Sequence, residues 1–257
     1  MLDKALTQLK DTVVNRTDLK GRTALYRAVA ANQPESVREL LRIPGVNVNK
    51  ANHSGQTPLD KAVQQKHTEI VQLLLAAPGI EVNKKSGSGV SPLCRAAADG
   101  YSECVKLLLG VPGIDINAGA PLYQAAWKGH HECVKLLLAM PGIDVNSVNQ
   151  SGTTPLMKAA WKGHTECVRL LLTAPGIEVN RRDGDGWAAL HAAACGGHIE
   201  CLKLLLAAPG IEVNIADHAG RTPLEQARAY RHTDCAKLLK KNSGFLSKFR
   251  GWNARRT

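Results

Sequence analysis

Histidine and cysteine recur as pairs three residues apart, a spacing that could place two metal ligands on one face of a helix. The pairs are His130/Cys133, His164/Cys167, His198/Cys201 and His232/Cys235. Structural zinc sites have four tetrahedral ligands, whereas each pair supplies two. We therefore expect no metal site and no cofactor.

Two other motifs match known sites only in part. Residues 184–189 fit the G-x-G-x-x-A pattern and precede an expected helix, but no long buried strand is expected before them, as a dinucleotide site requires. Asp183 and Asp185 resemble the start of a calcium loop, but its twelfth residue is Ala194 where a glutamate is needed. No nucleophile has a dedicated base near it in the pattern. The sequence therefore predicts a protein that is not an enzyme.

These residues belong to a repeated block, which must position them. It reads roughly G-x-T-P-L-x-x-A-A-x-x-G-H-x-E-C-V-K-L-L-L-x-x-P-G-I-x-V-N and occurs seven times. Its key leucine falls at Leu25, Leu59, Leu93, Leu122, Leu156, Leu190 and Leu224. Five of the six intervals are 34 residues, and the interval between repeats 3 and 4 is 29. Such a period indicates stacked copies of one supersecondary unit.

Repeat 5 shows what each unit should look like. Residues 154–162 begin with Thr-Pro-Leu and predict a helix, because proline is favoured in the first turn. Gly163 ends this helix. Residues 165–173 predict a second helix, apolar on most of its surface, which neighbouring repeats must cover. The Pro-Gly at 175–176 ends the second helix, so the chain should contain seven helix pairs.

Through its T-P-L-x-x-A-A-x-x-G-H core, V-x-L-L and V-N, the block resembles the ankyrin repeat over residues 21–242. The extra Pro-Gly lengthens the usual 33-residue unit to 34. The resemblance implies an all-α solenoid of stacked helix-turn-helix units with short β-turn fingers. It also implies that the concave side, made of finger tips and first helices, binds another protein. For the repeated histidine it implies a hydrogen bond within the helix turn.

The ends of the chain differ from the repeats. Residues 1–20 are expected to form a capping half repeat, and 243–257 a basic, aromatic tail. The residues that mimic a final half repeat are Leu6, Leu9, Val13, Val14 and Asn15. Repeat 7 replaces apolar residues with polar ones, as a terminal repeat requires; they are Arg228, Tyr230, Arg231, Lys240 and Lys241.

Repeat 4 accounts for the short interval. Only Ala-Gly-Ala-Pro at 118–121 separates Asn117 from Leu122, so its finger should be truncated. The deletion could be a tolerated loop change, or a notch beside Trp127 that admits a side chain or helix of a partner. The sequence does not decide between these interpretations.

Three of the four tryptophans fall on positions that are variable and exposed in the resembled family. These positions are the residue before T-P-L and the pair before G-H, and here they hold Trp127/Lys128, Trp161/Lys162 and Trp187. Tryptophan is enriched in binding hot spots. We expect these five residues to bind a partner protein with an acidic or apolar surface. The alternative is that the indole rings pack on neighbouring helices.

A rival function follows from positive charge. The net charge is +11, and the chain from Lys237 onward carries seven basic residues and no acidic one, which leaves +4 for the first 236 residues. An anionic ligand, nucleic acid or acidic membrane could bind the tail and the finger bases Lys50, Lys84, Lys85, Arg181 and Arg182.

The tail itself admits two interpretations. Phe245, Phe249 and Trp252 form a helical stripe beside Arg250, as in amphipathic binding segments. A short helix that caps repeat 7 would show the same pattern.

The seven cysteines are expected to be reduced, because equivalent atoms of stacked helices lie roughly 8–10 Å apart, beyond disulfide reach. We expect a monomer in the cytoplasm; the alternatives are a nuclear protein or an effector delivered to a host cytosol.

Overall fold

The computed structural model describes the backbone of residues 13–253 and the side chains of residues 13–243. Within that range the chain forms fourteen helices in seven consecutive pairs and no strand, as the repeats predict. The first helices are α2 (Ala24–Ala30), α4 (Pro58–Gln64), α6 (Pro92–Ala98), α8 (Pro121–Lys128), α10 (Pro155–Lys162), α12 (Ala189–Gly196) and α14 (Pro223–Ala229). The second helices are α3 (Pro34–Leu41), α5 (Thr68–Leu75), α7 (Ser102–Leu109), α9 (His131–Leu138), α11 (Thr165–Leu172), α13 (Ile199–Leu206) and α15 (Thr233–Asn253).

The T-P-L motif sets the start of each first helix. In α10 the Thr154 hydroxyl accepts a hydrogen bond from the backbone N–H of Met157, and Pro155 occupies the first helical position. Such a cap satisfies a donor that the helix leaves unpaired, and proline needs no donor there. Helix α10 ends at Gly163 with a φ of 74°, where a Cβ atom would lie 2.5 Å from the His198 ring. Glycine is therefore required both by the backbone and by the next repeat.

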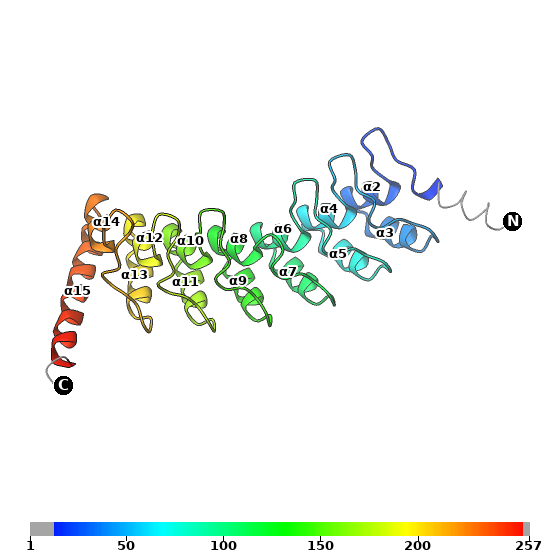
Figure 1. Ribbon diagram of the computed structural model, residues 1–257. Helices are drawn as coiled ribbons and strands as arrows, with labels where there is room; N and C mark the ends of the chain where they lie inside the picture. Colours follow the sequence, from blue (N-terminus) through cyan, green and yellow to red (C-terminus); the bar gives the residue numbers. More distant parts are fainter. Residues whose placement is uncertain (1–12, 254–257) are drawn as a thin grey trace. The chain divides into compact units, whose positions relative to one another are not determined.

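The helices form two compact units, with the boundary between Pro121 and Leu122. In the first unit, α2, α4 and α6 pack in one layer, and α3, α5 and α7 in a second (Figure 1). In the second unit, α10, α12 and α14 form one layer, and α9, α11, α13 and α15 the other. Each unit thus has a face made of first helices and a face made of second helices.

The core consists of the repeated leucines, alanines and cysteines. Leu59, Leu93, Leu156 and their equivalents through repeat 6 are at most 1% exposed, whereas Leu224 in the terminal repeat is half-buried. None of the seven cysteines is in a disulfide, and six are buried. Burial raises the pKa of Cys94 to about 11 and that of Cys167 to about 12, so these thiols are protonated at neutral pH and act as small apolar side chains.

An Asx-type turn shapes the fingers. In finger 5 the Asn149 side-chain oxygen accepts hydrogen bonds from the backbone N–H groups of Ser151 and Thr153, and Gly152 closes the turn back to the Asn149 carbonyl. Consecutive fingers are joined by backbone bonds, such as Gly184 N–H to Ser151 C=O at 2.9 Å. Local side-chain bonding of this kind favours a tight turn over helix or strand.

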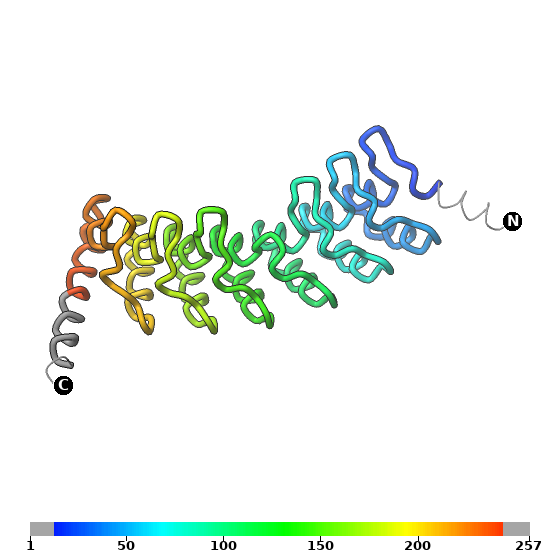
Figure 2. Tube along the Cα trace, viewed as in Figure 1, coloured from blue at the N-terminus to red at the C-terminus, as the bar shows by residue number. Residues whose placement is uncertain are grey.

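Repeat 4 has no such finger. Its chain goes from Asn117 through a tight turn, closed by the Ala120 N–H on the Asn117 carbonyl at 3.0 Å, directly into α8. Figure 2 shows loops projecting before α4, α6, α10 and α12 and none before α8. Repeat 4 therefore enters its first helix directly from this turn.

The asparagines of the V-N motif form a ladder of hydrogen bonds between consecutive repeats. The Asn146 amide donates to the Gly176 carbonyl at 2.8 Å and accepts from the Glu178 N–H at 3.0 Å. Asn49, Asn83 and Asn180 make the same pair of bonds with the Pro-Gly loop of the next repeat. The ladder gives the Pro-Gly insertion and the asparagine a shared structural role.

The ends of the chain are described in part. Asn15 makes the ladder bonds to Gly45 and Asn47, which supports the proposal that the N-terminal residues cap repeat 1; Leu6 and Leu9 lie outside the described residues. Helix α15 runs unbroken past residue 243, and the side chains of Phe245, Phe249, Arg250 and Trp252 lie outside the described range. None of the described helices is both long and apolar enough to span a membrane.

Candidate functional site

The three predicted tryptophans lie in the second unit. Trp127 and Trp161 occupy the last turns of α8 and α10, and Trp187 lies in finger 6, just before α12. Trp161 is 40% exposed, and Trp127 and Trp187 are half-buried. Lys128 and Lys162, which follow the first two, are exposed.

Lys158 joins the first two tryptophans. Its ammonium lies 4.5 Å from the ring centre of Trp161 and 5.9 Å from that of Trp127. Lys128 lies 5.0 Å from the Trp127 ring centre, and Lys162 lies 4.5 Å from that of Trp161. These are cation–π distances. Burial, together with the neighbouring Lys162, lowers the pKa of Lys158.

Trp161 and Trp187 border one small pocket, which we call the tryptophan slot. It has a volume of about 150 Å³, and its other lining residues are Thr153, Met157, Lys158, Asp183 and Ala192. An apolar cavity of this size can hold a molecule as large as benzene. The slot therefore has room for one apolar or aromatic side chain, with a cation and a carboxylate also lining it.

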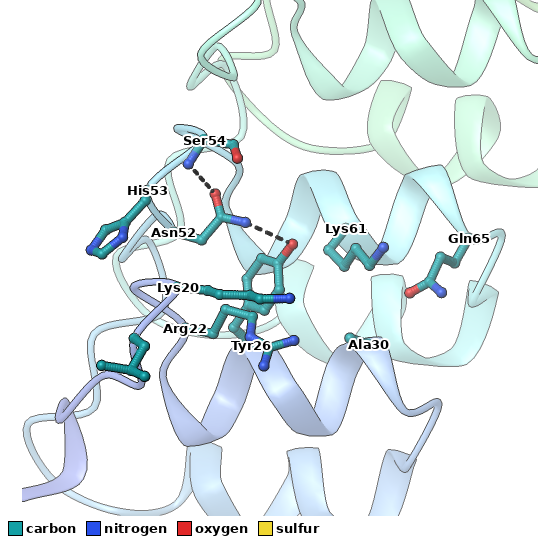
Figure 3. A pocket seen from close by; sticks show the side chains of 10 residues that line it. Lys20, Arg22, Tyr26, Ala30, Asn52, His53, Ser54, Lys61 and Gln65 are labelled. Atoms are coloured by element: carbon teal, nitrogen blue, oxygen red, sulfur yellow. Dashed lines mark hydrogen bonds between the residues drawn. The ribbon is translucent and has the colours of Figure 1, made fainter.

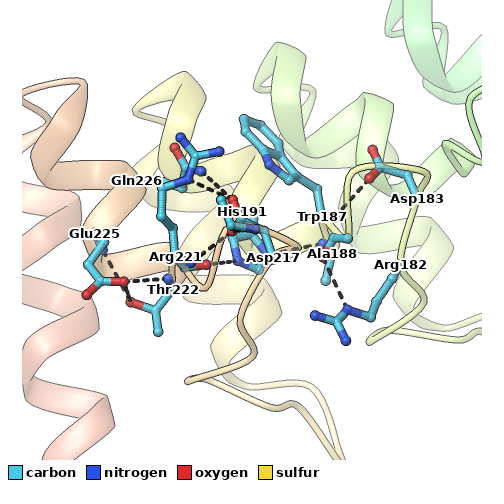
Figure 4. Close-up of polar contacts among 12 residues, drawn as sticks. Arg182, Asp183, Trp187, Ala188, His191, Asp217, Arg221, Thr222, Glu225 and Gln226 are labelled. Carbon is cyan, nitrogen blue, oxygen red and sulfur yellow. Dashed lines mark hydrogen bonds and ion pairs between the residues drawn. The ribbon is translucent and has the colours of Figure 1, made fainter.

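Trp187 is held in place from two sides. Its ring stacks on the buried His191 imidazole at a centroid distance of 6.2 Å, and its backbone N–H donates to Asp183 Oδ1 at 2.9 Å (Figure 4). His191 accepts from the Ala188 N–H through Nδ1, and its Nε2 donates to the Arg221 carbonyl. Burial lowers the pKa of His191, which favours the neutral ring that this bonding requires. Finger 6 therefore presents Trp187 in a fixed position.

The recurrent histidines serve as links between repeats. Nε2 of His164 donates to the Trp127 carbonyl and Nε2 of His198 to the Trp161 carbonyl, each at 3.0 Å. The expected bond within the helix turn is thus wrong, since the ring reaches back to the preceding repeat. Cys167 in α11 and Cys201 in α13 are buried. Across the described residues, no three His, Cys, Asp or Glu side chains converge to hold a metal ion.

The partial calcium motif has a structural role as well. Asp183 Oδ1 accepts from the backbone N–H groups of Asp185 and Trp187. These bonds form the finger turn that places Trp187. The carboxylate shapes the loop.

Most of the basic finger residues that could bind an anionic ligand already contact other groups of the protein. Lys50 donates to the Asn15 carbonyl, and Arg182 to the Gly186 carbonyl. Lys84 and Arg181 pair with Glu81 and Glu178 at 2.8 and 2.9 Å. Lys85 is exposed.

Sequence reasoning missed Lys158 and Met157 as members of the site. Lys158 is the second residue after the repeated leucine, a position that also holds Arg27, Lys61 and Arg95. This column is basic in four of seven repeats, and that bias could have identified it as a surface position. Nothing in the sequence shows that one lysine reaches the tryptophans of two repeats.

Comparison with known proteins shows the same repeats. A family model described as "Ankyrin repeats (3 copies)" matches residues 2–86, 44–120, 69–149, 93–183 and 180–248. The ankyrin repeat domain of Bcl-3, described as a unique member of the IkappaB protein family, has 29% identity and a TM-score of 0.74, with 85% of this chain and 99% of that chain covered. The human ASB11 ankyrin repeat domain has 27% identity and a TM-score of 0.71, with 85% and 98% covered. No curated protein matched the sequence.

Proposed function

The chain belongs to the ankyrin-repeat family, and from this premise we propose that its second unit binds a partner protein through the tryptophan face. We define this face as Trp127, Lys128, Lys158, Trp161, Lys162 and Trp187. Ankyrin-repeat domains generally are protein–protein interaction modules, and this family and the similar structures are typically not enzymes. The proposed mechanism is therefore recognition by a preformed surface, with no chemical step.

The observation that carries the proposal is the exposed Trp161 ring beside the tryptophan slot. Trp161 is 40% exposed and lines the slot together with Trp187. Removing such apolar area from water contributes roughly 25 cal/mol per Å². Because ordered helices and finger 6 already hold both rings, a partner would lose little free energy in ordering the site.

The charges around the rings indicate the partner's chemistry. Lys128, Lys158 and Lys162 all lie on this face, and Asp183 is the one acidic residue that lines the slot. A partner that inserts an apolar or aromatic side chain into the slot and surrounds it with carboxylates would be complementary to this arrangement.

The test is a quantitative affinity capture from the native cell, with purified chain as bait. Wild type is compared with Trp127→Ala/Trp161→Ala and with a matched surface control, Lys106→Ala/Lys135→Ala. A partner of the tryptophan face is recovered with wild type and the control and is depleted with the tryptophan variant.

The affinity of the recovered partner is then measured for the single variants Trp127→Ala and Trp161→Ala. Trp161→Ala should weaken binding by about 2 kcal/mol or more, as for a hot-spot residue. If both tryptophan variants bind the partner as tightly as wild type, the rings are packing residues and the site assignment fails.

A further inference from the structure

A second, larger pocket lies in the first unit. It has a volume of about 490 Å³ and is bordered by the first two fingers together with α2 and α4. Its lining includes Lys20, Arg22, Tyr26, Asn52, His53 and Lys61. In Figure 3, Lys20 and Arg22 lie beside the Tyr26 ring, and the Lys61 ammonium points along α4 toward Gln65.

We propose that this pocket, the basic pocket, binds an acidic peptide segment of a partner protein. Three permanently basic side chains line it, and none of its lining residues is acidic. The same lysine column that gives Lys158 to the tryptophan face gives Lys61 to this pocket. A pocket whose charged lining residues are all cations favours a partner that brings carboxylates.

The two lysines supply the free positive charge. Arg22 is already paired with Asp18 at 2.7 Å, and its hydrogen bonds keep the pKa of Asp18 well below the ordinary range, so that this pair is nearly neutral overall. No carboxylate among the described residues forms an ion pair with Lys20 or Lys61, and the Lys61 ammonium donates to the Gln64 amide oxygen at 3.5 Å. An incoming carboxylate would therefore meet two uncompensated ammonium groups.

The floor of the basic pocket is rigid and polar. The Tyr26 hydroxyl donates to Gln56 Oε1 at 2.6 Å and accepts from Asn52 Nδ2 at 3.1 Å. The Asn52 side-chain oxygen also holds the finger turn through the N–H groups of Ser54 and Gln56. These bonds fix the shape of the pocket before any partner binds.

A peptide fits this surface better than a nucleic acid. Sites for single-stranded nucleic acid combine positive charge with aromatic rings on which bases stack. The Tyr26 ring is only 4% exposed, so the exposed His53 imidazole is the one ring of the lining on which a base could stack, whereas Leu19, also in the lining, is 99% exposed. An apolar residue among the acidic ones of a peptide could contact Leu19.

The experiment measures binding of fluorescein-labelled Glu-Glu-Leu-Glu-Glu-Leu-Glu-Glu by fluorescence anisotropy. Wild type should bind it, and at least about tenfold more tightly than the same peptide with every glutamate replaced by glutamine. Lys20→Glu/Lys61→Glu should lower the affinity by about tenfold or more. A control with the same charge change at exposed residues of the second helices α7 and α9, Lys106→Glu/Lys135→Glu, should bind as wild type does.

One further variant distinguishes binding at the basic pocket from binding at the tryptophan face. Trp127→Ala/Trp161→Ala should bind the peptide as wild type does, because those residues lie outside the basic pocket. If the Lys20→Glu/Lys61→Glu variant unfolds at a lower temperature than wild type, Lys20→Gln/Lys61→Gln is used in its place. Absence of peptide binding, equal affinity in the pocket variants, displacement by millimolar inorganic phosphate, or tighter binding of oligo(dT) would each overturn the proposal.

Discussion

Nε2 of His164 donates a hydrogen bond to the backbone carbonyl of Trp127 across 3.0 Å. The imidazole stands at the start of α11, and the carbonyl belongs to the last turn of α8, where a helix leaves carbonyls unpaired. One side chain thereby joins repeats 4 and 5 and fixes the end of the helix that carries Trp127. The stability of the stack and the position of the tryptophan face are therefore coupled.

His164→Ala should lower the free energy of unfolding by about 1–2 kcal/mol, because it leaves the Trp127 carbonyl without its donor. The matched control is His131→Ala, since the His131 side chain is 52% exposed and its Nε2 lies 3.6 Å from the exposed Glu132 carboxylate. The control should cost under about 0.5 kcal/mol. Urea unfolding of both variants decides the matter, and equal midpoints would show that the link does not stabilise the stack.

Stability should fall as the pH drops from 7.5 toward 5.5. Burial lowers the pKa of both His164 and His191 below the ordinary value of 6.5. Below that value the two histidines bind protons more readily in the unfolded chain than in the folded chain. Their contribution to the free energy of unfolding is therefore fully present above pH 6.5 and is lost as the pH falls through the folded-state pKa values.

The check on this pH dependence is a series of urea midpoints across the range. His164→Asn/His191→Asn removes both titrating rings and should give a shallower decline than wild type. A decline of the same steepness in the double variant would assign the effect to other groups.

Asn180→Ala should lower the free energy of unfolding by about 1 kcal/mol, because it removes two hydrogen bonds to the loop of the next repeat. Asn214 has the same place in the following repeat and is exposed, but repeat 7 continues as α15 and has no Pro-Gly loop to receive it. Asn214→Ala should therefore change stability by less than about 0.5 kcal/mol. Chemical denaturation that ranks the two variants in the opposite order would contradict the ladder.

Leu137→Ala should cost about 2–5 kcal/mol by leaving a cavity, since Leu137 is fully buried. Lys135→Ala, two residues earlier on the same helix, changes an exposed side chain and should cost under about 0.5 kcal/mol. Denaturant melts of the two variants compare the faces of α9 directly. Similar losses of stability in the two variants would mean that the buried and exposed faces of α9 are wrongly assigned.

The helix pairs could be predicted from the sequence because each repeat carries its own signals. Thr154 caps a helix, Gly163 ends it, and the period of 34 residues repeats both. The contacts between repeats could not be predicted. The His164 bond and the Asn146 ladder join residues about one repeat apart through geometry that no local pattern encodes. For the same reason the sequence predicts the tryptophans as surface residues but does not predict that Lys158 lies over the rings of both Trp127 and Trp161.

The tryptophans should differ from one another when truncated. Trp161 is 40% exposed, and the ammonium groups of Lys158 and Lys162 lie over its ring, so Trp161→Ala should change the free energy of unfolding by under about 0.5 kcal/mol. Trp187 is half-buried and stacks on His191, so Trp187→Ala should cost about 1–3 kcal/mol.

Trp187→Phe is the variant that separates packing from recognition, because it keeps an aromatic ring over His191 while it reduces the area offered to the tryptophan slot. It should recover most of the lost stability. Urea denaturation of the three purified variants needs no partner. If Trp161→Ala proves as destabilising as Trp187→Ala, then Trp161 is a structural residue, and its exposure cannot be taken as a sign of a binding surface.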